Sequence, residues 1–260
     1  MTTPAPHTIP SAPTAIAVIG STGLVGHQVV ELFQAEGHDV VEVSQNSGVD
    51  MVTGDGLDDA LAGVEVVIDV INSATPEDPS EEFFRQTSSN LASAAIAAGI
   101  GHYVVLSIVG ADLLAPVAGY MRGKLLQEAA AASSGIPWTV VRSTQFHELA
   151  AGITESMIRD GEVHAAAAKI QTIASAELAA IVTRIATSPP LNAIHEVGGP
   201  QRMTFADMAR TVLADQHRDL PVVEASAATY FGLPIDEITL VPHADAELGF
   251  EPLSEWLARN

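Results

Sequence analysis

The sequence Ala15-Ile16-Ala17-Val18-Ile19-Gly20-Ser21-Thr22-Gly23-Leu24-Val25-Gly26 joins an unbroken apolar run to a turn with three glycines. Such a run is typical of a strand buried on both faces of a parallel sheet. In the turn, the first glycine permits a tight reversal, the second lets a diphosphate approach the backbone, and the third lets the next helix pack closely. The start of that helix offers unpaired N–H groups and partial positive charge. We interpret residues 20–26 as a nucleotide site; the alternative is a glycine-rich connection without a ligand.

Strand and helix patterns alternate along the following residues. The sequence predicts strands at 40–43, 64–71, 103–106 and 137–141, and helices at 24–36, 80–98 and 120–133. Strands separated by helices indicate right-handed crossovers and a parallel sheet covered on both faces. The pattern is looser after residue 145, with helices near 147–159, 175–187, 204–215 and 253–258 and short strands near 170–173 and 194–197.

These patterns predict an α/β protein with a doubly wound parallel sheet. Residues 15–260 are interpreted as one domain, with a cofactor core over about 15–145 and a small C-terminal substrate lobe over about 146–260. Residues 1–14 contain four prolines among small residues, which predicts a flexible tail.

The composition excludes several classes of function. Asp and Glu number 32 against 11 Lys and Arg, and a net charge of −21 argues against nucleic acids and anionic membranes as partners. The absence of cysteine excludes disulfides, cysteine nucleophiles and Cys-ligated metals. His243 and Asp245 lack a third metal ligand nearby, so no metal is expected. No apolar run is long enough to span a membrane and no signal peptide is recognised, which favours a cytoplasmic protein.

Several motifs resemble a known superfamily. The spacing Gly-x-x-Gly-x-x-Gly, the Leu106-Ser107-Ile108-Val109-Gly110 segment, the later Tyr-x-x-x-Lys and the run Gly135-Ile136-Pro137-Trp138-Thr139-Val140-Val141-Arg142-Ser143-Thr144-Gln145-Phe146 are similar to short-chain dehydrogenases/reductases. They look most like the atypical branch of NmrA-like and NAD(P)H-binding proteins. The resemblance covers nearly the whole chain after residue 14. It implies a Rossmann-type fold and a nicotinamide cofactor, and leaves the substrate open.

Ser107, Tyr120 and Lys124 match the catalytic trio of that superfamily in type, order and spacing. Tyr120 would exchange a proton with the substrate oxygen, Lys124 would favour the phenolate and bind the cofactor ribose, and Ser107 would hold the substrate. Tyr120 and Lys124 are four residues apart and share one helix face; the alternative is that they merely begin a surface helix. Phe84 occupies the apparent position of the relay Asn, which a water would have to replace, while Asn90 is interpreted as a packing or capping residue.

The segment after the second strand, Ser44-Gln45-Asn46, contains neither a carboxylate nor a cation. A carboxylate there would favour NAD, so we expect NADP(H) to be preferred over NAD(H), bound by hydrogen bonds. The resemblance places Asp55 and Gly56 near the adenine, although Asp55 could instead cap a helix. It also places Asn72 and Ser73 beneath the ribose, although these could form a simple turn.

The remaining candidates lie in the second half of the chain. The resemblance places Gln145, Phe146 and His147 beside the nicotinamide and the substrate, although a histidine at a helix start is more often structural. Arg142 is expected to pair with a carboxylate near the sheet edge. Tyr230-Phe231-Gly232 is either an aromatic lid or buried packing.

The sequence therefore favours an NAD(P)H-dependent oxidoreductase that reduces a small carbonyl or quinone-like compound, with Tyr120 as acid/base. Two alternatives stay open: an NADP(H)-binding redox sensor without turnover, and an epimerase or isomerase that retains its cofactor. We expect a small-molecule substrate and either a monomer or a homodimer.

Overall fold

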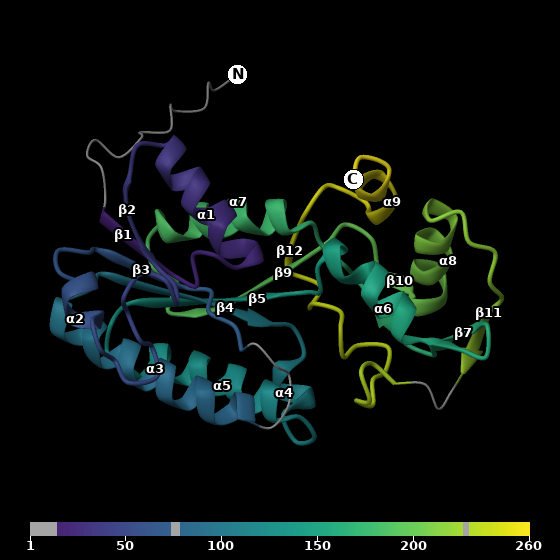
Figure 1. Cartoon of the computed structure of the whole chain (residues 1–260), viewed down its shortest axis with the longest axis horizontal. Coiled ribbons are helices and arrows are strands. Elements are labelled where there is room, and N and C mark those ends of the chain that lie inside the picture. The colour runs from purple at the N-terminus through teal and green to yellow at the C-terminus, as the bar shows by residue number, and fades with distance from the viewer. Residues whose placement is uncertain (1–14, 74–78, 226–228) are drawn as a thin grey trace.

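The computed structural model describes residues 15–73, 79–225 and 229–260, so the segment predicted to be a tail lies outside the described residues. Seven parallel strands form the central sheet in the order β12-β9-β5-β4-β3-β1-β2 (Figure 1). They are β1 (Ala15–Ile19), β2 (Asp39–Val43), β3 (Val66–Asp69), β4 (His102–Ile108), β5 (Trp138–Ser143), β9 (Ala193–Gly198) and β12 (Glu247–Leu248).

The direction of winding reverses between β1 and β3. The chain first moves from β1 to β2 at one edge, and then returns to the other side of β1 to form β3. In doubly wound sheets, ligands bind at this reversal, beyond the carboxyl ends of the strands. The sheet therefore confirms the predicted fold class and places the glycine turn, which follows β1, at the expected ligand edge.

Helices cover both faces of this sheet (Figure 1). One face carries α1 (Leu24–Ala35) and α7 (Ser175–Ala186), and the other carries α2 (Leu57–Ala60), α3 (Pro79–Ala98) and α5 (Gly119–Ser133). Successive strand residues point to opposite faces. Accordingly, Ile16 and Val18 pack with α1 and α7, whereas Ala17 and Ile19 pack in the core on the α2 and α3 side.

Two glycines of the turn are required by their backbone surroundings. Gly20 has φ +90°, and a Cβ there would lie 3.0 Å from the backbone of Ile71. A Cβ on Gly26 would lie 2.1 Å from the carbonyl oxygen of Gly20. Helix α1 therefore packs against the turn as closely as the glycine spacing predicts.

Part of the C-terminal half forms a lobe with its own core (Figure 1). Its elements are η1 (His147–Leu149), α6 (Ala150–Ser156), β6 (Ile158–Arg159), β7 (Glu162–Ala166), β8 (Lys169–Ile170), β10 (Met203–Thr204), α8 (Phe205–Asp215), β11 (Val222–Ala225) and α9 (Leu253–Leu257). The short helix α4 (Ala111–Leu114), which follows β4, packs against this core. The strands form a β11-β7-β6 sheet and a β10-β8 pair.

Parts of the C-terminal half differ from the expectation. Strands β9 and β12 and helix α7 belong to the central sheet and its cover, so a boundary near residue 145 does not separate core from lobe. The helix expected near 147–159 ends at Ser156, because the chain turns into the β6–β7 hairpin.

In the part of the chain that the structure describes, no helix combines the length and apolar character needed to cross a bilayer.

Candidate functional site

A cavity of about 1150 Å³ follows the carboxyl edge of the sheet. It takes lining residues from the ends of five strands: Gly20 after β1, Val43 to Gln45 at β2, Val70 to Asn72 after β3, Leu106 to Ile108 at β4, and Ser143 to Phe146 at β5. One continuous space therefore joins the glycine turn to the residues of the proposed catalytic trio.

The cavity brings together many of the residues that the sequence singled out. The candidates that line it are Gly20, Thr22, Gly23, Leu24, Val25, Ser44, Gln45, Asn72, Ser107, Tyr120, Lys124, Gln145 and Phe146. The candidates outside its lining are Ser21, Gly26, Asn46, Asp55, Gly56, Ser73 and His147.

The first turn of α1 faces the cavity through Leu24 and Val25. Its N-cap residue, Gly23, makes no side-chain capping hydrogen bond, so the first N–H groups of the helix are left for another acceptor. Gly26 is absent from the lining because it packs against Gly20, and the Ser21 side chain is buried. This end of the cavity suits a diphosphate.

The cavity wall beyond β2 contains residues that the sequence did not single out. Asp50, Met51 and Val52 line the cavity, whereas Asp55 does not. The carboxylate of Asp50 accepts hydrogen bonds from the backbone N–H groups of Val52 (2.8 Å) and Thr53 (3.2 Å). Aspartate favours such Asx turns, so Asp50 was the sequence signal that could have predicted this loop. The alternative that Asp55 caps a helix is not seen, since the N-cap of α2 is Gly56, in a left-handed conformation without a side-chain hydrogen bond.

Asn90 fixes this loop from α3. Its side-chain amide donates to the carbonyl oxygens of Met51 (3.1 Å) and Val52 (2.8 Å). After β2, Ser44 and Ser47 exchange hydrogen bonds, which close a tight turn that leaves Asn46 outside the cavity. Asn90 thus acts by hydrogen bonding to residues 51 and 52, and it shapes the wall of the site.

Tyr120 lies at the start of α5 and its hydroxyl donates to Oδ1 of Asn72 (2.8 Å). Burial raises the pKa of Tyr120 to about 12, and the Asn72 hydrogen bond only partly opposes this shift. The phenol is therefore neutral near pH 7 and held by an amide oxygen in the segment after β3.

Lys124 is buried one turn further along α5. Its ammonium group donates to the carbonyl oxygen of Leu106 (2.7 Å) and to the side chain of Gln127, rather than to Tyr120. Burial lowers the pKa of Lys124 to about 8, while the carboxylates of Asp69 and Glu128 act in the opposite direction. The two residues share the cavity, but the contact that would favour the phenolate is not formed here.

Phe84 separates the two catalytic candidates. Its ring is fully buried, contacts the Tyr120 ring edge-to-face with centroids 5.7 Å apart, and lies 5.0 Å from Nζ of Lys124. The side chain at the apparent relay position is thus apolar. Its space is created by Gly123, where a Cβ would lie 2.5 Å from the Phe84 ring.

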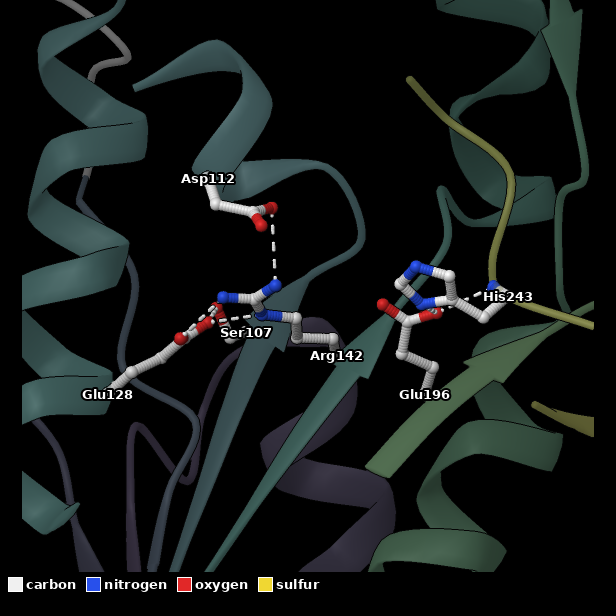
Figure 2. A network of polar contacts seen from close by, with 6 residues as sticks. All are labelled: Ser107, Asp112, Glu128, Arg142, Glu196 and His243. Carbon is white, nitrogen blue, oxygen red and sulfur yellow. Dashed lines mark hydrogen bonds and ion pairs between the residues drawn. The ribbon is translucent and has the colours of Figure 1, made fainter. Parts of the chain in front are cut away.

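Ser107 belongs to a polar network that contains the buried Glu128 and Arg142 and the exposed Asp112 (Figure 2). The Ser107 hydroxyl donates to Oε1 of Glu128 at 2.5 Å. Arg142 donates to both oxygens of Glu128, at 2.9 and 2.8 Å, and lies 3.2 Å from Asp112. The expected carboxylate partner of Arg142 is therefore found twice, and the carboxylate hydrogen bonds raise the pKa of Arg142.

Gln145 and Phe146 follow β5 and line the cavity, but the next residue points elsewhere. The His147 ring lies between the hydroxyl of Thr172 (Nδ1, 2.8 Å) and the carbonyl oxygen of Glu251 (Nε2, 3.0 Å). A carbonyl oxygen only accepts, so Nε2 carries the proton; burial lowers the pKa of His147 and keeps the ring neutral. His147 joins the β5 loop to the chain before α9.

The outer part of the cavity is apolar and was largely missed by the sequence analysis. Its lining here includes Phe83, Val117, Leu149, Tyr230, Phe231 and Leu233. These residues come from α3, the loop before α5, η1 and the turn at 230–233, so no single sequence motif contains them. Only the Tyr230-Phe231 pair carried a local signal.

A nicotinamide dinucleotide fits the residues of this cavity. The glycine backbone and the uncapped start of α1 suit the diphosphate, and Oε1 of Gln145 is a buried acceptor without a partner among the described residues. Within residues 15–73, 79–225 and 229–260, no group of three or more potential metal ligands comes together.

Sheet order, glycine turn and cavity define a dinucleotide-binding α/β protein. The chain belongs to a NAD(P)H-binding family, whose sequence profile matches residues 20–189. The resemblance to the atypical short-chain branch fits this family.

Three known proteins illustrate what the chain is similar to. It is 28% identical over 243 residues to an NAD(P)H azoreductase of Xenophilus azovorans, covering 84% of this chain and 82% of that protein. Its fold is similar to an NADPH-dependent quinone oxidoreductase of Escherichia coli (TM-score 0.65, 20% identity, 94% of this chain and 98% of the other). It is also similar to a triphenylmethane reductase of Citrobacter sp. (TM-score 0.60, 20% identity, 82% and 79%).

Proposed function

We propose that the protein is an NAD(P)H-dependent oxidoreductase of the short-chain dehydrogenase type that reduces a small carbonyl or quinone-like compound. The observation that carries this proposal is one continuous cavity, which extends from the uncapped start of α1 to Tyr120 and continues into an apolar wall. The names of the relatives, an azoreductase and a quinone oxidoreductase among them, support the same reaction class.

In this proposal, the chain holds the cofactor along the sheet edge. The glycine turn binds the diphosphate, the Asp50–Val52 loop borders the adenine, and Lys124 and Gln145 bind near the nicotinamide ribose and ring. The bound nicotinamide supplies a hydride to the acceptor. Tyr120, oriented by Asn72, donates the accompanying proton to the acceptor oxygen.

Ser107 acts as a second contact to the substrate oxygen. Its hydroxyl proton is directed to Glu128, so a substrate hydroxyl can donate to the Ser107 oxygen, whereas a carbonyl oxygen would need that proton to be released. This arrangement favours the alcohol product over the carbonyl at Ser107 and leaves Tyr120 as the main proton donor.

We further propose that NADP(H) is preferred over NAD(H). The support is the segment directly after β2, where Ser44 and Gln45 line the cavity and offer hydrogen bonds; the nearest lining carboxylate, Asp50, lies five residues further on and already accepts hydrogen bonds from its own loop. A hydrogen-bonded phosphate without a cation is held weakly. The expected preference is therefore modest, about ten-fold or less in Kd, which corresponds to about 1.4 kcal/mol.

The test compares the wild type with Tyr120→Phe. The variant should bind NADPH within about two-fold of the wild type, by calorimetric titration, while kcat with a quinone or small aldehyde falls by about 10²-fold or more. An unchanged kcat would remove Tyr120 from the mechanism. Binding without turnover, with a strong preference for one redox state, would favour the sensor; tightly retained cofactor would favour the epimerase.

A further inference from the structure

Phe231 has a backbone conformation that is unusual for its residue type. It has φ +47° and is followed by Gly232 with φ +81°. Tyr230 and Leu233 exchange backbone hydrogen bonds of 3.0 and 2.9 Å across this pair. Two positive φ values inside such a pair define a type I′ turn, whose first central position favours Asn, Asp or Gly. A bulky aromatic residue there is strained, and strain of this kind gathers at functional sites.

The strained residue is also exposed. Phe231 is 62% exposed, although a phenylalanine gains free energy by burial. Its turn does not lack a place to pack, because the neighbouring Tyr230 is anchored against Phe205 in the core of the lobe, with ring centroids 6.2 Å apart. The Phe231 ring contacts Tyr230 edge-to-face at 4.8 Å and lines the cavity. Tyr230 therefore fixes the turn to the core of the lobe, while the Phe231 ring stays exposed at the cavity wall.

Other apolar side chains of the same cavity are exposed as well. Val117 is 55% exposed and Leu149 is 44% exposed, and both belong to the lining. The outer lining residues named above include no Asp, Glu, Lys or Arg, and the ammonium group of Lys124 deeper in the cavity is buried and hydrogen-bonded. This part of the wall offers apolar contact and little to compensate a charged acceptor.

We propose that Phe231 is a specificity-determining residue, which packs its ring on the face of a flat, uncharged aromatic acceptor. This inference rests on the proposed reductase function and narrows its substrate class to ring systems such as quinones. An aromatic face held at the wall provides stacking energy that a small aliphatic carbonyl cannot use. The turn strain then has a functional explanation, since Gly would suit the backbone but would offer no ring.

The experiment measures the binding of 1,4-naphthoquinone to the NADP⁺-loaded protein by calorimetry, and in parallel the KM for naphthoquinone and for acetaldehyde. The variants are Phe231→Gly, which suits the backbone but removes the ring, and Phe231→Tyr, which keeps an aromatic face. The matched control is Phe250→Gly, because Phe250 is 90% exposed and does not line the cavity.

Phe231→Gly should weaken naphthoquinone binding and raise its KM by roughly three- to ten-fold, with no fall in Tm and little change for acetaldehyde. Phe231→Tyr and Phe250→Gly should remain within two-fold of the wild type. Equal naphthoquinone affinity in Phe231→Gly and the wild type would overturn the inference, as would failure of the wild type to bind naphthoquinone. If the wild type binds naphthoquinone through Phe231 but never oxidises NADPH, the proposed function fails while the aromatic contact stands.

Discussion

At the scale of single residues, Lys124 carries the clearest pH dependence. Burial lowers its pKa to about 8, so the ammonium form is present in the folded protein below pH 8 and is lost as the pH rises through that value. The groups near its ammonium are the carboxylates of Asp69 and Glu128 and the neutral side chains of Gln127 and Phe84. An anionic cofactor prefers the ammonium form, so its binding should weaken above pH 8.

We therefore predict that NADPH affinity is constant from pH 6.5 to 7.5 and falls by about ten-fold at pH 9, as linkage to one proton requires. The Lys124→Met variant should bind NADPH more weakly at pH 7, and its affinity should no longer fall above pH 8. The control is Lys169→Met, since Lys169 is the other lysine of the chain and lies outside the cavity lining. Fluorescence titration of NADPH across pH measures both. A fall in affinity that persists in Lys124→Met would assign it to another group.

At the scale of elements, the network in Figure 2 ties four of them together. Ser107 lies near the end of β4, Asp112 in α4, Glu128 in α5 and Arg142 in β5. Glu128 and Arg142 have side chains only 10% and 9% exposed, so removing either charge leaves the other with too few partners. This pairing fixes α5, which carries Tyr120 and Lys124, against the sheet.

Glu128→Gln should lower the free energy of unfolding by about 2 kcal/mol, because the buried Arg142 keeps only the exposed Asp112 as an ionic partner. The control is the half-buried ion pair between Glu81 of α3 and Arg122 of α5, where Glu81→Gln should cost about 0.5 kcal/mol or less. Urea unfolding of both variants at pH 7 gives the comparison. Equal losses in the two variants would mean that the network does not hold α5.

The elements also show where sequence-based prediction succeeds. The buried run of β1, the glycine turn and the long helices α1, α3 and α5 carry strong local patterns, and their predicted positions match within a few residues. Strands β6, β7 and β11 were missed, because short strands of a small sheet lack a long alternating pattern.

The same limit applies to the site. Ser107, Tyr120 and Lys124 line one cavity because the end of β4 and the start of α5 adjoin, which the sequence order implies. Their catalytic roles stay predictions. The Asp50 loop and the Phe231 turn depend on contacts between distant segments, so a single sequence gives little warning of them.

At the scale of the whole molecule, the charge of −21 sets the field that a ligand meets before it arrives. The few cationic side chains do little to reduce this negative potential, because many of them are paired with carboxylates. Examples are Arg85, Arg122, Arg142 and Arg184. A nicotinamide dinucleotide is an anion, so the protein as a whole repels the cofactor that its cavity accommodates. Salt screens this repulsion beyond about 10 Å at 0.1 M.

The association rate of NADPH should therefore rise with salt between 10 and 300 mM NaCl, opposite to the usual fall for electrostatically steered partners. NADH is the matched comparison, because it lacks one phosphate and should show a smaller rise. Stopped-flow fluorescence gives both rates directly. A rate that falls with salt would mean that the local field of the α1 start and Lys124 outweighs the excess acid. The sign of one slope thus decides whether the cofactor is drawn in by its site or enters against the field of the molecule.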